Sequence, residues 1–415
     1  MAKIKIQTFV QADQEWSGGV LFVLSLFKPV LGIEFEILSS PISGCFNISS
    51  GIESSIKVNK NYWHHFISKE YQECHSLFCQ MDDIYFLEKI FHLVNCIQEY
   101  DSNETDAYGR FSYYHSWQYI NHNITHNVVL ETMETFIRSY FRGTPIVKPP
   151  TRLFLSHDID TIHGELMQNG RYYLKTFQFD KLKKVVLNYL LNRPGWANMD
   201  LINRLHDDYG VKHAYFWLVE KGKQNNIINA DYSKSELGQY SQQCVSNGLH
   251  KSSGNADFRT ETELLPFPCI ANRNHFLRYR LPSHWEELED AELKVDASVG
   301  FAEHFGFRNS YGYAFRPYNP NKQKCYSHIA VPLHMMDATF RNYMKLPVEE
   351  TGDTVIDFIE ANKTGCILSL LWHNTFFTNG KYEGYAEQYI KILRYLHDNQ
   401  FETLDINDLT QIEVN

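Results

Sequence analysis

Hydrophobic and polar positions follow different patterns in the two parts of the chain. In the first part, up to residue 145, the pattern predicts strands early and helices later. The predicted strands are Lys3–Val10, Gly32–Leu38 and Ser55–Val58, and the predicted helices are Ile84–Tyr100 and Asn127–Tyr140. We therefore expect a smaller N-terminal α/β domain over residues 1–145, whose role the sequence does not indicate.

A proline-rich segment separates this part from the rest of the chain. Thr144–Pro150 holds three prolines in seven residues, which interrupt helix and sheet alike. Strands then alternate with helical stretches over residues 151–415, an order typical of parallel strands in an α/β architecture. We expect a β/α barrel there, with an open doubly wound sheet as the alternative. The predicted strands are Arg152–Ser156, Lys212–Leu218, Gly248–His250, His275–Arg280, Lys294–Ala297, His328–Pro332, Gly365–Trp372 and Glu402–Asp405.

Composition and charge narrow the class of protein. The chain has 415 residues, of which 43% are hydrophobic and 21% charged, as in an ordinary folded protein. A net charge of −10 without a long basic block argues against nucleic acid as a partner. The longest apolar stretch, Val20–Ile33, is interrupted by charged and turn-forming residues and is too short to span a bilayer. The first residues lack the pattern of an export signal, so we expect a cytoplasmic protein without a transmembrane segment.

Two aspartates follow the first apolar run of the second part. Because side chains alternate along a strand, Asp158 and Asp160 point to the same face, about 7 Å apart. The C-terminal ends of such buried strands are where α/β barrels and open α/β sheets keep their active sites. One carboxylate could hold a metal while the other moves protons, and a surface turn that happens to hold two acids is the alternative.

Further polar residues gather at the predicted ends of other strands. His250, Asp296, Asp337 and His373 are each assigned to one of these predicted strands or to its end. The stretch Arg273–Arg280 adds three arginines and His275. Each residue alone has a structural explanation, such as a cap or an ion pair. Their recurrence at strand ends favours a shared site.

The order of these motifs resembles the polysaccharide deacetylase superfamily, the NodB-like fold. The similarity is strongest to a branch with an extra N-terminal α/β domain, found among bacterial surface-polysaccharide gene products. It covers most of residues 150–380 and, more loosely, the first domain. The segments that carry it are Tyr108–Phe111, Ser156–Asp160, Gly248–His250, Arg273–Arg278, Val295–Phe307 and Leu371–His373.

The resemblance implies a deformed (β/α)7 barrel that binds a divalent metal, usually zinc, through one aspartate and two histidines. On this basis Asp160 is the expected metal ligand and His250 the first histidine ligand. Asp158 is then the general base and His373 the general acid that protonates the leaving amine. A carboxylate base and an imidazolium acid have the opposite protonation states that this chemistry needs near neutral pH.

Three further residues follow from the same resemblance. Arg278 or Arg280 is expected to orient the base, and Asp296 belongs to the motif that tunes the acid. Arg278 and Asp296 lie in the segments that carry the similarity, and Arg280 follows one of them by two residues. We therefore count Arg278 and Asp296 with Asp158 and His373 among the expected catalytic residues.

The sequence departs from the family at the second histidine ligand. The family's metal motif is His-x-x-x-His, whereas the fourth residue after His250 is Gly254. One aspartate and one histidine leave a catalytic zinc site short of its usual three protein ligands. His275 from the next predicted strand could replace the missing ligand. Alternatively, the site works without a tightly bound metal, or it only binds glycan.

An aromatic and arginine-rich segment suggests a carbohydrate surface. Gly306–Tyr318 combines rings, arginines and small residues, and aromatic residues make up 15% of the chain. Aromatic faces stack on sugar C–H surfaces, and arginines bind carboxylates or hydroxyls. The residues we expect to contact substrate are Arg308, Arg316, Tyr318, Asp337 and Trp372.

The expected function is hydrolysis of a carbon–nitrogen bond. The leading hypothesis is a metal-dependent N-deacetylase of an acetylated sugar or glycan intermediate in surface-polysaccharide biosynthesis. Its expected partners are a carbohydrate substrate and other polysaccharide-biosynthesis proteins. The alternatives are a non-catalytic glycan-binding or assembly protein with a degenerate site, and a metal-free cyclic-amide hydrolase.

Overall fold

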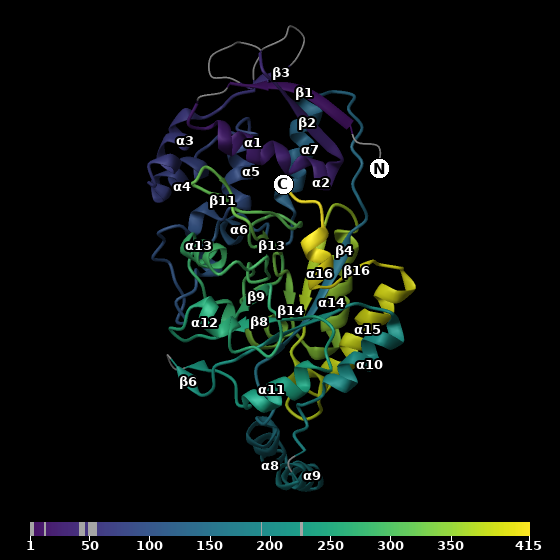
Figure 1. Cartoon of the computed structure of the whole chain (residues 1–415). Coiled ribbons are helices and arrows are strands. Elements are labelled where there is room, and N and C mark those ends of the chain that lie inside the picture. The colour runs from purple at the N-terminus through teal and green to yellow at the C-terminus, as the bar shows by residue number, and fades with distance from the viewer. Residues whose placement is uncertain (1–3, 12–13, 41–45, 49–55, 192, 225–226) are drawn as a thin grey trace.

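The computed structural model describes residues 4–11, 14–40, 46–48, 56–191, 193–224 and 227–415. A small sheet with its helices forms one end of the molecule, and a larger sheet forms the middle (Figure 1). The helices α8 (Arg171–Lys175) and α9 (Phe179–Leu190) project from the opposite end. Among the described residues, no helix combines the length and the apolar character needed to cross a bilayer.

The small sheet is parallel and has β1 (Ile4–Val10) at its centre, between β2 (Ile33–Leu38) and β3 (Phe46–Ile48). Two predicted strands, Lys3–Val10 and Gly32–Leu38, agree with β1 and β2 over the described residues. The third prediction, Ser55–Val58, begins outside the described residues, and its described part forms only an isolated bridge from Ile56 to Ile48. The accompanying helices are α1 (Ser17–Ser25), α2 (Phe27–Leu31), α3 (Lys60–Ile67), α4 (Tyr71–Cys79), α5 (Phe86–Val94), α6 (Trp117–Ile120) and α7 (Val128–Tyr140).

The large sheet is parallel throughout and curls into part of a barrel. Its order is β13-β10-β9-β8-β5-β4-β15-β14, and β16 pairs with the start of β4. The central strand β4 is buried along nearly its whole length, which accounts for its continuous apolar run. The strands are β4 (Arg152–Ile159), β5 (Ala214–Trp217), β8 (Asn247–Lys251), β9 (Ala271–Asn274), β10 (Val295–Asp296), β13 (Ile329–Ala330), β14 (Met335–Met336), β15 (Ile367–Leu371) and β16 (Thr403–Leu404).

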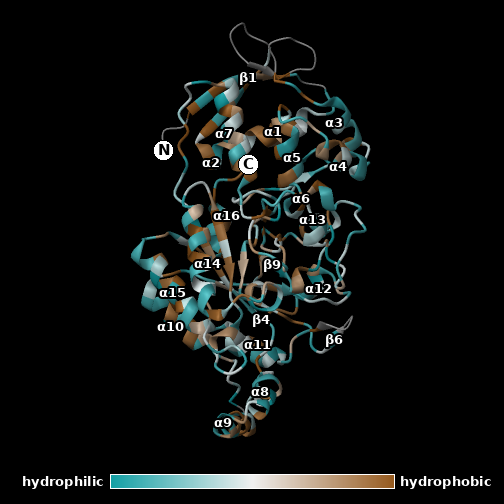
Figure 2. Cartoon of the chain, turned by 180° about the vertical axis from the view of Figure 1, so that it is seen from behind, coloured by the Kyte–Doolittle hydropathy of each residue, from teal (hydrophilic) through white to brown (hydrophobic). Residues whose placement is uncertain are grey.

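Helices and short hairpins surround this sheet (Figure 2). The helix α11 begins at a capping box, in which Ser233 and Glu236 exchange side-chain and backbone hydrogen bonds. The helices are α10 (Met199–Tyr209), α11 (Lys234–Ser241), α12 (Phe258–Thr262), α13 (Ser283–Asp290), α14 (Val348–Ala361), α15 (Tyr385–Asp398) and α16 (Ile406–Gln411). The short strand pairs are β6 (Lys223–Gln224) with β7 (Ile227–Ile228), and β11 (Tyr318–Asn319) with β12 (Lys324–Cys325).

The predicted α/β class with a deformed parallel barrel is confirmed. The described sheet has nine strands, whereas the hydrophobic pattern predicts eight and the resemblance implies seven. The strand predicted at His275–Arg280 is wrong, because β9 occupies Ala271–Asn274 instead. Three of its four residues are polar although all four are buried, so the hydrophobic pattern did not reveal it. The two-residue strand β14 was also missed.

The two parts of the chain are joined by a continuous core and a buried ion pair. One cluster of buried apolar side chains extends from Ile6 in β1 to Leu409 in α16. The Nε and Nη2 atoms of Arg308 donate to the Glu99 carboxylate, at 2.9 and 2.7 Å. Its Nη1 atom donates to the Gly300 carbonyl oxygen. Both side chains are 2% exposed. The domain boundary at residues 145–151 stays a prediction, but this ion pair links the two sides of it.

Removal of Glu99 should strongly destabilise the fold. Glu99→Ala leaves the Arg308 guanidinium buried without its counter-charge, which typically costs about 3–5 kcal/mol. We expect a loss of that order in the free energy of unfolding, measured by guanidinium chloride denaturation followed by circular dichroism.

The matched control is Arg138→Ala, which breaks the Arg138–Glu134 ion pair on α7, where the Arg138 side chain is 71% exposed. Exposed pairs of this kind contribute less than about 0.5 kcal/mol. Equal effects for the two variants would contradict a structural role for the buried pair.

Candidate active site

A cavity of about 210 Å³ opens at the C-terminal ends of the parallel strands. This is the edge at which β/α folds place their catalytic side chains. Residues from several strands and from the N-terminal part of the chain converge on it. The lining includes Arg110, Asp158, Asp160, Gln168, His250, His275, Phe276, His373, Phe376 and Tyr382.

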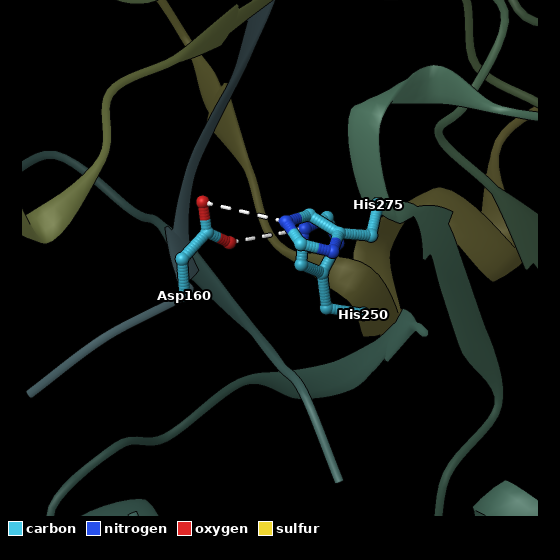
Figure 3. A group of neighbouring side chains, drawn as sticks. All are labelled: Asp160, His250 and His275. Atoms are coloured by element: carbon cyan, nitrogen blue, oxygen red, sulfur yellow. Dashed lines mark ion pairs between the residues drawn. The ribbon is translucent and has the colours of Figure 1, made fainter. Parts of the chain in front are cut away.

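Three potential metal ligands lie together in this cavity (Figure 3). Asp160 follows β4, His250 lies in β8 and His275 follows β9. One donor atom from each side chain lies within 4.8 Å of the other two. The Asp160 Oδ1 atom is 3.2 Å from His250 Nε2, and Oδ2 is 3.8 Å from His275 Nε2.

The spacing and surroundings of these donors fit a divalent cation. Ligand bonds of about 2.0–2.2 Å in a tetrahedral zinc site separate the donor atoms by about 3.3–3.6 Å. The Nδ1 atom of His250 donates to the Arg273 carbonyl oxygen at 3.0 Å, which fixes the ring with Nε2 toward Asp160. Among the described residues, the buried Asp160 Oδ1 and His275 Nδ1 atoms have no hydrogen-bond partner.

The electrostatics of Asp160 and His275 suit metal ligation. For His250, burial works against a charged ring, but the Asp158 and Asp160 carboxylates outweigh it and raise the pKa of this ring. Burial opposes ionisation of Asp160, but the nearby His275 and His250 rings outweigh it and hold the pKa of this carboxyl well below its usual range. Burial lowers the pKa of His275, so that its ring is neutral at physiological pH. An ionised carboxylate and neutral imidazole are the forms that bind divalent cations.

Asp158 lies beside this cluster and is held by a buried arginine. Its Oδ1 atom accepts a hydrogen bond from Arg273 Nη1 at 2.9 Å, and its Oδ2 atom lies 3.6 Å from His250 Nε2. The same Arg273 nitrogen also donates to Ser156 Oγ at 2.8 Å, and Nε donates to the Ala297 carbonyl oxygen at 3.1 Å. The Arg273 side chain has no exposed surface, so its position is fixed by these bonds.

His373 also lies beside Asp160 and is paired with Asp337. Its Nδ1 atom donates to Asp337 Oδ1 at 2.7 Å, and Nε2 lies 3.8 Å from Asp160 Oδ2. The backbone N–H of His373 donates to the second Asp337 oxygen at 2.6 Å. Burial works against a charged ring, but the Asp337 carboxylate outweighs it and raises the pKa of His373 to about 10. The ring is therefore an imidazolium at neutral pH.

A strained turn positions His275. The two residues after it, Phe276 and Leu277, both have left-handed backbone conformations, with φ of 60° and 52°. Such conformations cost about 1–3 kcal/mol each in residues other than glycine, and they cluster at functional sites. The turn ends β9 and leaves the His275 ring 4.9 Å from that of His250.

The N-terminal part of the chain contributes one wall of the cavity. Arg110 is buried, and its Nη1 atom donates to the Phe276 carbonyl oxygen at 3.0 Å. Asp106 holds the guanidinium from behind, with a hydrogen bond of 2.7 Å to Nε. The ring of Tyr108 lies 5.4 Å from that of Phe276. Arg110 therefore joins the segment before the proline-rich boundary to the strained turn at the site.

Two of the expected catalytic residues lie elsewhere. Arg278 is half-buried and lines a neighbouring cavity, whereas Arg273 is the arginine bonded to Asp158. Asp296 is buried in a separate network with His284 and Ser298, at 3.1 and 2.6 Å. The carboxylate next to His373 belongs to Asp337, which we had expected to contact substrate. Arg273 and Asp337 therefore take the positions that we had given to Arg278 and Asp296.

None of the five expected substrate contacts, Asp337 included, lines the cavity. Arg308 is bound to Glu99 inside the core. Arg316 donates to the Ser327 carbonyl oxygen, and its backbone N–H to Asn415. Tyr318 packs its ring against Phe22 and Phe91, and Trp372 is fully buried beside Tyr389. These four side chains therefore make their contacts within the protein, where they stabilise the fold.

Comparison with known proteins gives only distant similarities. No protein-family model and no curated protein matches the chain. A structure described as a polysaccharide deacetylase from Mycobacterium smegmatis is similar at 10% identity with a TM-score of 0.40, over 65% of this chain and 93% of that one.

Two further solved structures are similar at the same level. One is a peptidoglycan N-acetylglucosamine deacetylase in complex with 4-naphthalen-1-yl-N-oxidanyl-benzamide, with 10% identity, a TM-score of 0.30, and coverage of 63% of this chain and 88% of that one. The other is a 4-α-glucanotransferase from Thermococcus litoralis, with 10% identity, a TM-score of 0.35, and coverage of 63% and 40%. Similarities this low do not assign a function, so the interpretation rests on the side chains of the site.

Metal content should depend on His275. We expect about one zinc or similar divalent ion per chain in protein purified without chelator. His275→Ala should lower the metal content at least about tenfold, because two ligands remain where a catalytic site normally has three. Inductively coupled plasma mass spectrometry measures this directly.

His163→Ala is the matched control, because His163 is a partly buried histidine that pairs with Glu236 at 2.7 Å outside the cluster. Its metal content should equal that of the wild type. Metal retained in His275→Ala would assign the third ligand to another residue.

Proposed function

We propose that the protein is a metal-dependent hydrolase of amide bonds, acting as an N-deacetylase on an acetylated sugar or glycan. One observation carries this proposal: Asp158 and His373 both lie beside the Asp160–His250–His275 cluster. Asp158 Oδ2 is 3.6 Å from His250 Nε2, and His373 Nε2 is 3.8 Å from Asp160 Oδ2. A base and an acid beside a potential cation site form the arrangement that amide hydrolysis requires.

The residues divide the reaction between them. Asp160, His250 and His275 would hold a divalent cation, and its chemistry there would be Lewis-acid polarisation of the amide carbonyl and a lower pKa of water. Asp158 accepts a proton from the attacking water, and Arg273 holds the carboxylate in position for it. His373 then donates a proton to the nitrogen of the leaving amine.

The protonation states at neutral pH suit this division. The His373 ring carries its proton because the adjacent Asp337 raises its pKa to about 10. The Nδ1 proton of this ring is bound by Asp337, which leaves the Nε2 proton available to the substrate. The pairing of His373 with Asp337 thus supplies an acid in a cavity whose other carboxylates serve as base and ligand.

A carbohydrate substrate is supported by the aromatic lining. Phe276, Phe376 and Tyr382 all line the cavity, and rings of this kind stack on the C–H faces of sugars. The resemblance noted in the sequence supports a role for such a reaction in surface-polysaccharide biosynthesis. We extend the proposal to that pathway, to a cytoplasmic location, to zinc as the cation, and to other proteins of the pathway as partners.

Asp158→Asn should abolish turnover. We expect a loss of about 10²–10⁴-fold in kcat, because an amide does not accept the proton from water. The measurement is release of acetate from N-acetylated oligosaccharides, with circular dichroism to verify the fold.

Asp296→Asn is the control, since it alters a buried aspartate that lies at a strand end but does not line the cavity. It should retain activity within about threefold. Unchanged turnover in Asp158→Asn would contradict the proposed mechanism. Glycan binding without any deacetylated product in the wild type would instead favour the non-catalytic alternative.

Arg273 and Arg278 form a matched pair for testing which arginine holds the base. Arg273→Lys should lower kcat/KM by about tenfold or more, because a lysine cannot reproduce bonds to Asp158, Ser156 and Ala297 at once. Arg278→Lys should stay within about twofold of the wild type. A larger loss of kcat/KM in Arg278→Lys than in Arg273→Lys would instead show that Arg278 orients Asp158.

A further inference from the structure

A helical hairpin projects from the end of the molecule that lies opposite the small sheet (Figures 1 and 2). It comprises a π-helical turn at Leu166–Gly170, α8 and α9. We refer to residues 166–191 and 193 as the basic hairpin. Its inward face is small, with Tyr173 and Val185 buried.

The basic hairpin exposes an unusual number of large apolar side chains. Met167 and Phe177 are each 77% exposed, and Leu190 is 73% exposed. The other exposed apolar residues of this segment are Leu174, Phe179, Val186, Leu187, Tyr189 and Leu191. Scattered exposed apolar residues are ordinary, but a contiguous group of this size marks an interaction surface.

The exposed apolar residues of α9 form a stripe. Phe179, Val186 and Leu190 are separated by seven and four positions, a spacing that places them on one face of a helix. That stripe is distinct from the face that packs inward through Val185. The helix therefore has one apolar face that packs inside the hairpin and a second apolar face that no described residue covers.

The same segment carries a strong positive charge. Residues 166–193 contain six basic residues and one acidic residue, a net charge of +5 in a chain whose total is −10. The basic residues are Arg171, Lys175, Lys181, Lys183, Lys184 and Arg193. Lys183 lies close to the exposed apolar stripe of α9, and its side chain is 80% exposed.

We propose that the basic hairpin docks on the surface of an anionic lipid bilayer. Exposed rings and aliphatic side chains combined with lysines are the signature of helices that lie in the membrane interface. Each lysine near an anionic surface adds about a fivefold gain in affinity. The apolar stripe inserts at the level of the headgroups, while the lysines contact lipid phosphates.

A bilayer fits this surface better than a protein partner does. Lysine side chains can extend from an apolar stripe to reach the headgroup phosphates. Lys183 forms an exposed ion pair with Asp180 at 3.9 Å. In a protein interface both charges would lose their hydration, which is unfavourable. Two copies of the hairpin packed together would also bring twelve positive charges into proximity, by doubling the six in each.

The hairpin is directly connected to the cavity. Gln168, at its base, lines the cavity and accepts hydrogen bonds from Lys381 Nζ at 2.9 Å and Tyr382 Oη at 3.0 Å. Asn169 donates to the Asn379 carbonyl oxygen at 3.1 Å. Docking would thus hold one cavity wall at the membrane surface. If the proposed function also holds, the substrate is a glycan presented at that surface.

Vesicle co-sedimentation with the full chain tests the docking without any measurement of activity. Wild-type protein should bind vesicles with about 30 mol% phosphatidylglycerol, bind pure phosphatidylcholine at least about tenfold more weakly, and dissociate at about 0.5 M salt. Phe177→Ser combined with Leu190→Ser should weaken binding at least about tenfold. Lys175→Gln combined with Lys183→Gln should have a similar effect at low salt.

The matched control combines Ile120→Ser with Val245→Ser, which removes exposed apolar residues from other surfaces of the molecule. It should bind like the wild type. The proposal is overturned if wild-type protein does not bind anionic vesicles, or if the hairpin variants bind as strongly as the control. It is also overturned if light scattering shows a dimer that the hairpin variants dissociate while vesicle binding is absent.

Discussion

A single buried guanidinium organises the centre of this molecule. Arg273 contacts Ser156 and Asp158 on β4 and the backbone that follows β10, and its own carbonyl oxygen fixes the His250 ring. One side chain therefore sets the position of the proposed base and one proposed ligand at once. The Nε and Nη1 atoms of this buried guanidinium are hydrogen-bonded, whereas Nη2 has no hydrogen-bond partner among the described residues. A fully buried charge with so few bonds depends on each of them, so this arrangement tolerates little displacement. The geometry of the cavity follows from that requirement.

The sequence revealed residues whose position follows from strand periodicity. Asp158 and Asp160 were found because alternation along one apolar strand is a local property. His250 was found because it ends the predicted strand Gly248–His250 and matches a motif of the family that the sequence resembles. The sequence could not reveal which arginine meets Asp158, since that depends on the register between β4, β9 and β10. Polar residues fill β9, so the strand itself was misplaced, and with it the assignment to Arg278.

The misassigned substrate contacts have a different origin. The segment Gly306–Tyr318 was interpreted as a sugar surface because of its rings and arginines, yet its side chains are largely buried. Arg308 meets Glu99 across 209 positions of sequence, a pairing that local patterns do not encode. The rings and arginines of this segment instead help to hold the two parts of the chain together. Residue types alone therefore did not distinguish a binding surface from an interior contact.

The contact of Arg110 with the turn at Phe276 has a consequence for the order of folding. The two residues lie 166 positions apart, and Arg110 also meets Tyr343 across 233 positions. Contacts this distant in sequence form late, because the intervening chain must first be ordered. During synthesis the N-terminal wall of the cavity emerges early, whereas His373 emerges among the last elements. The cavity is thus completed only when nearly the whole chain is folded, and no shorter intermediate contains all of its groups.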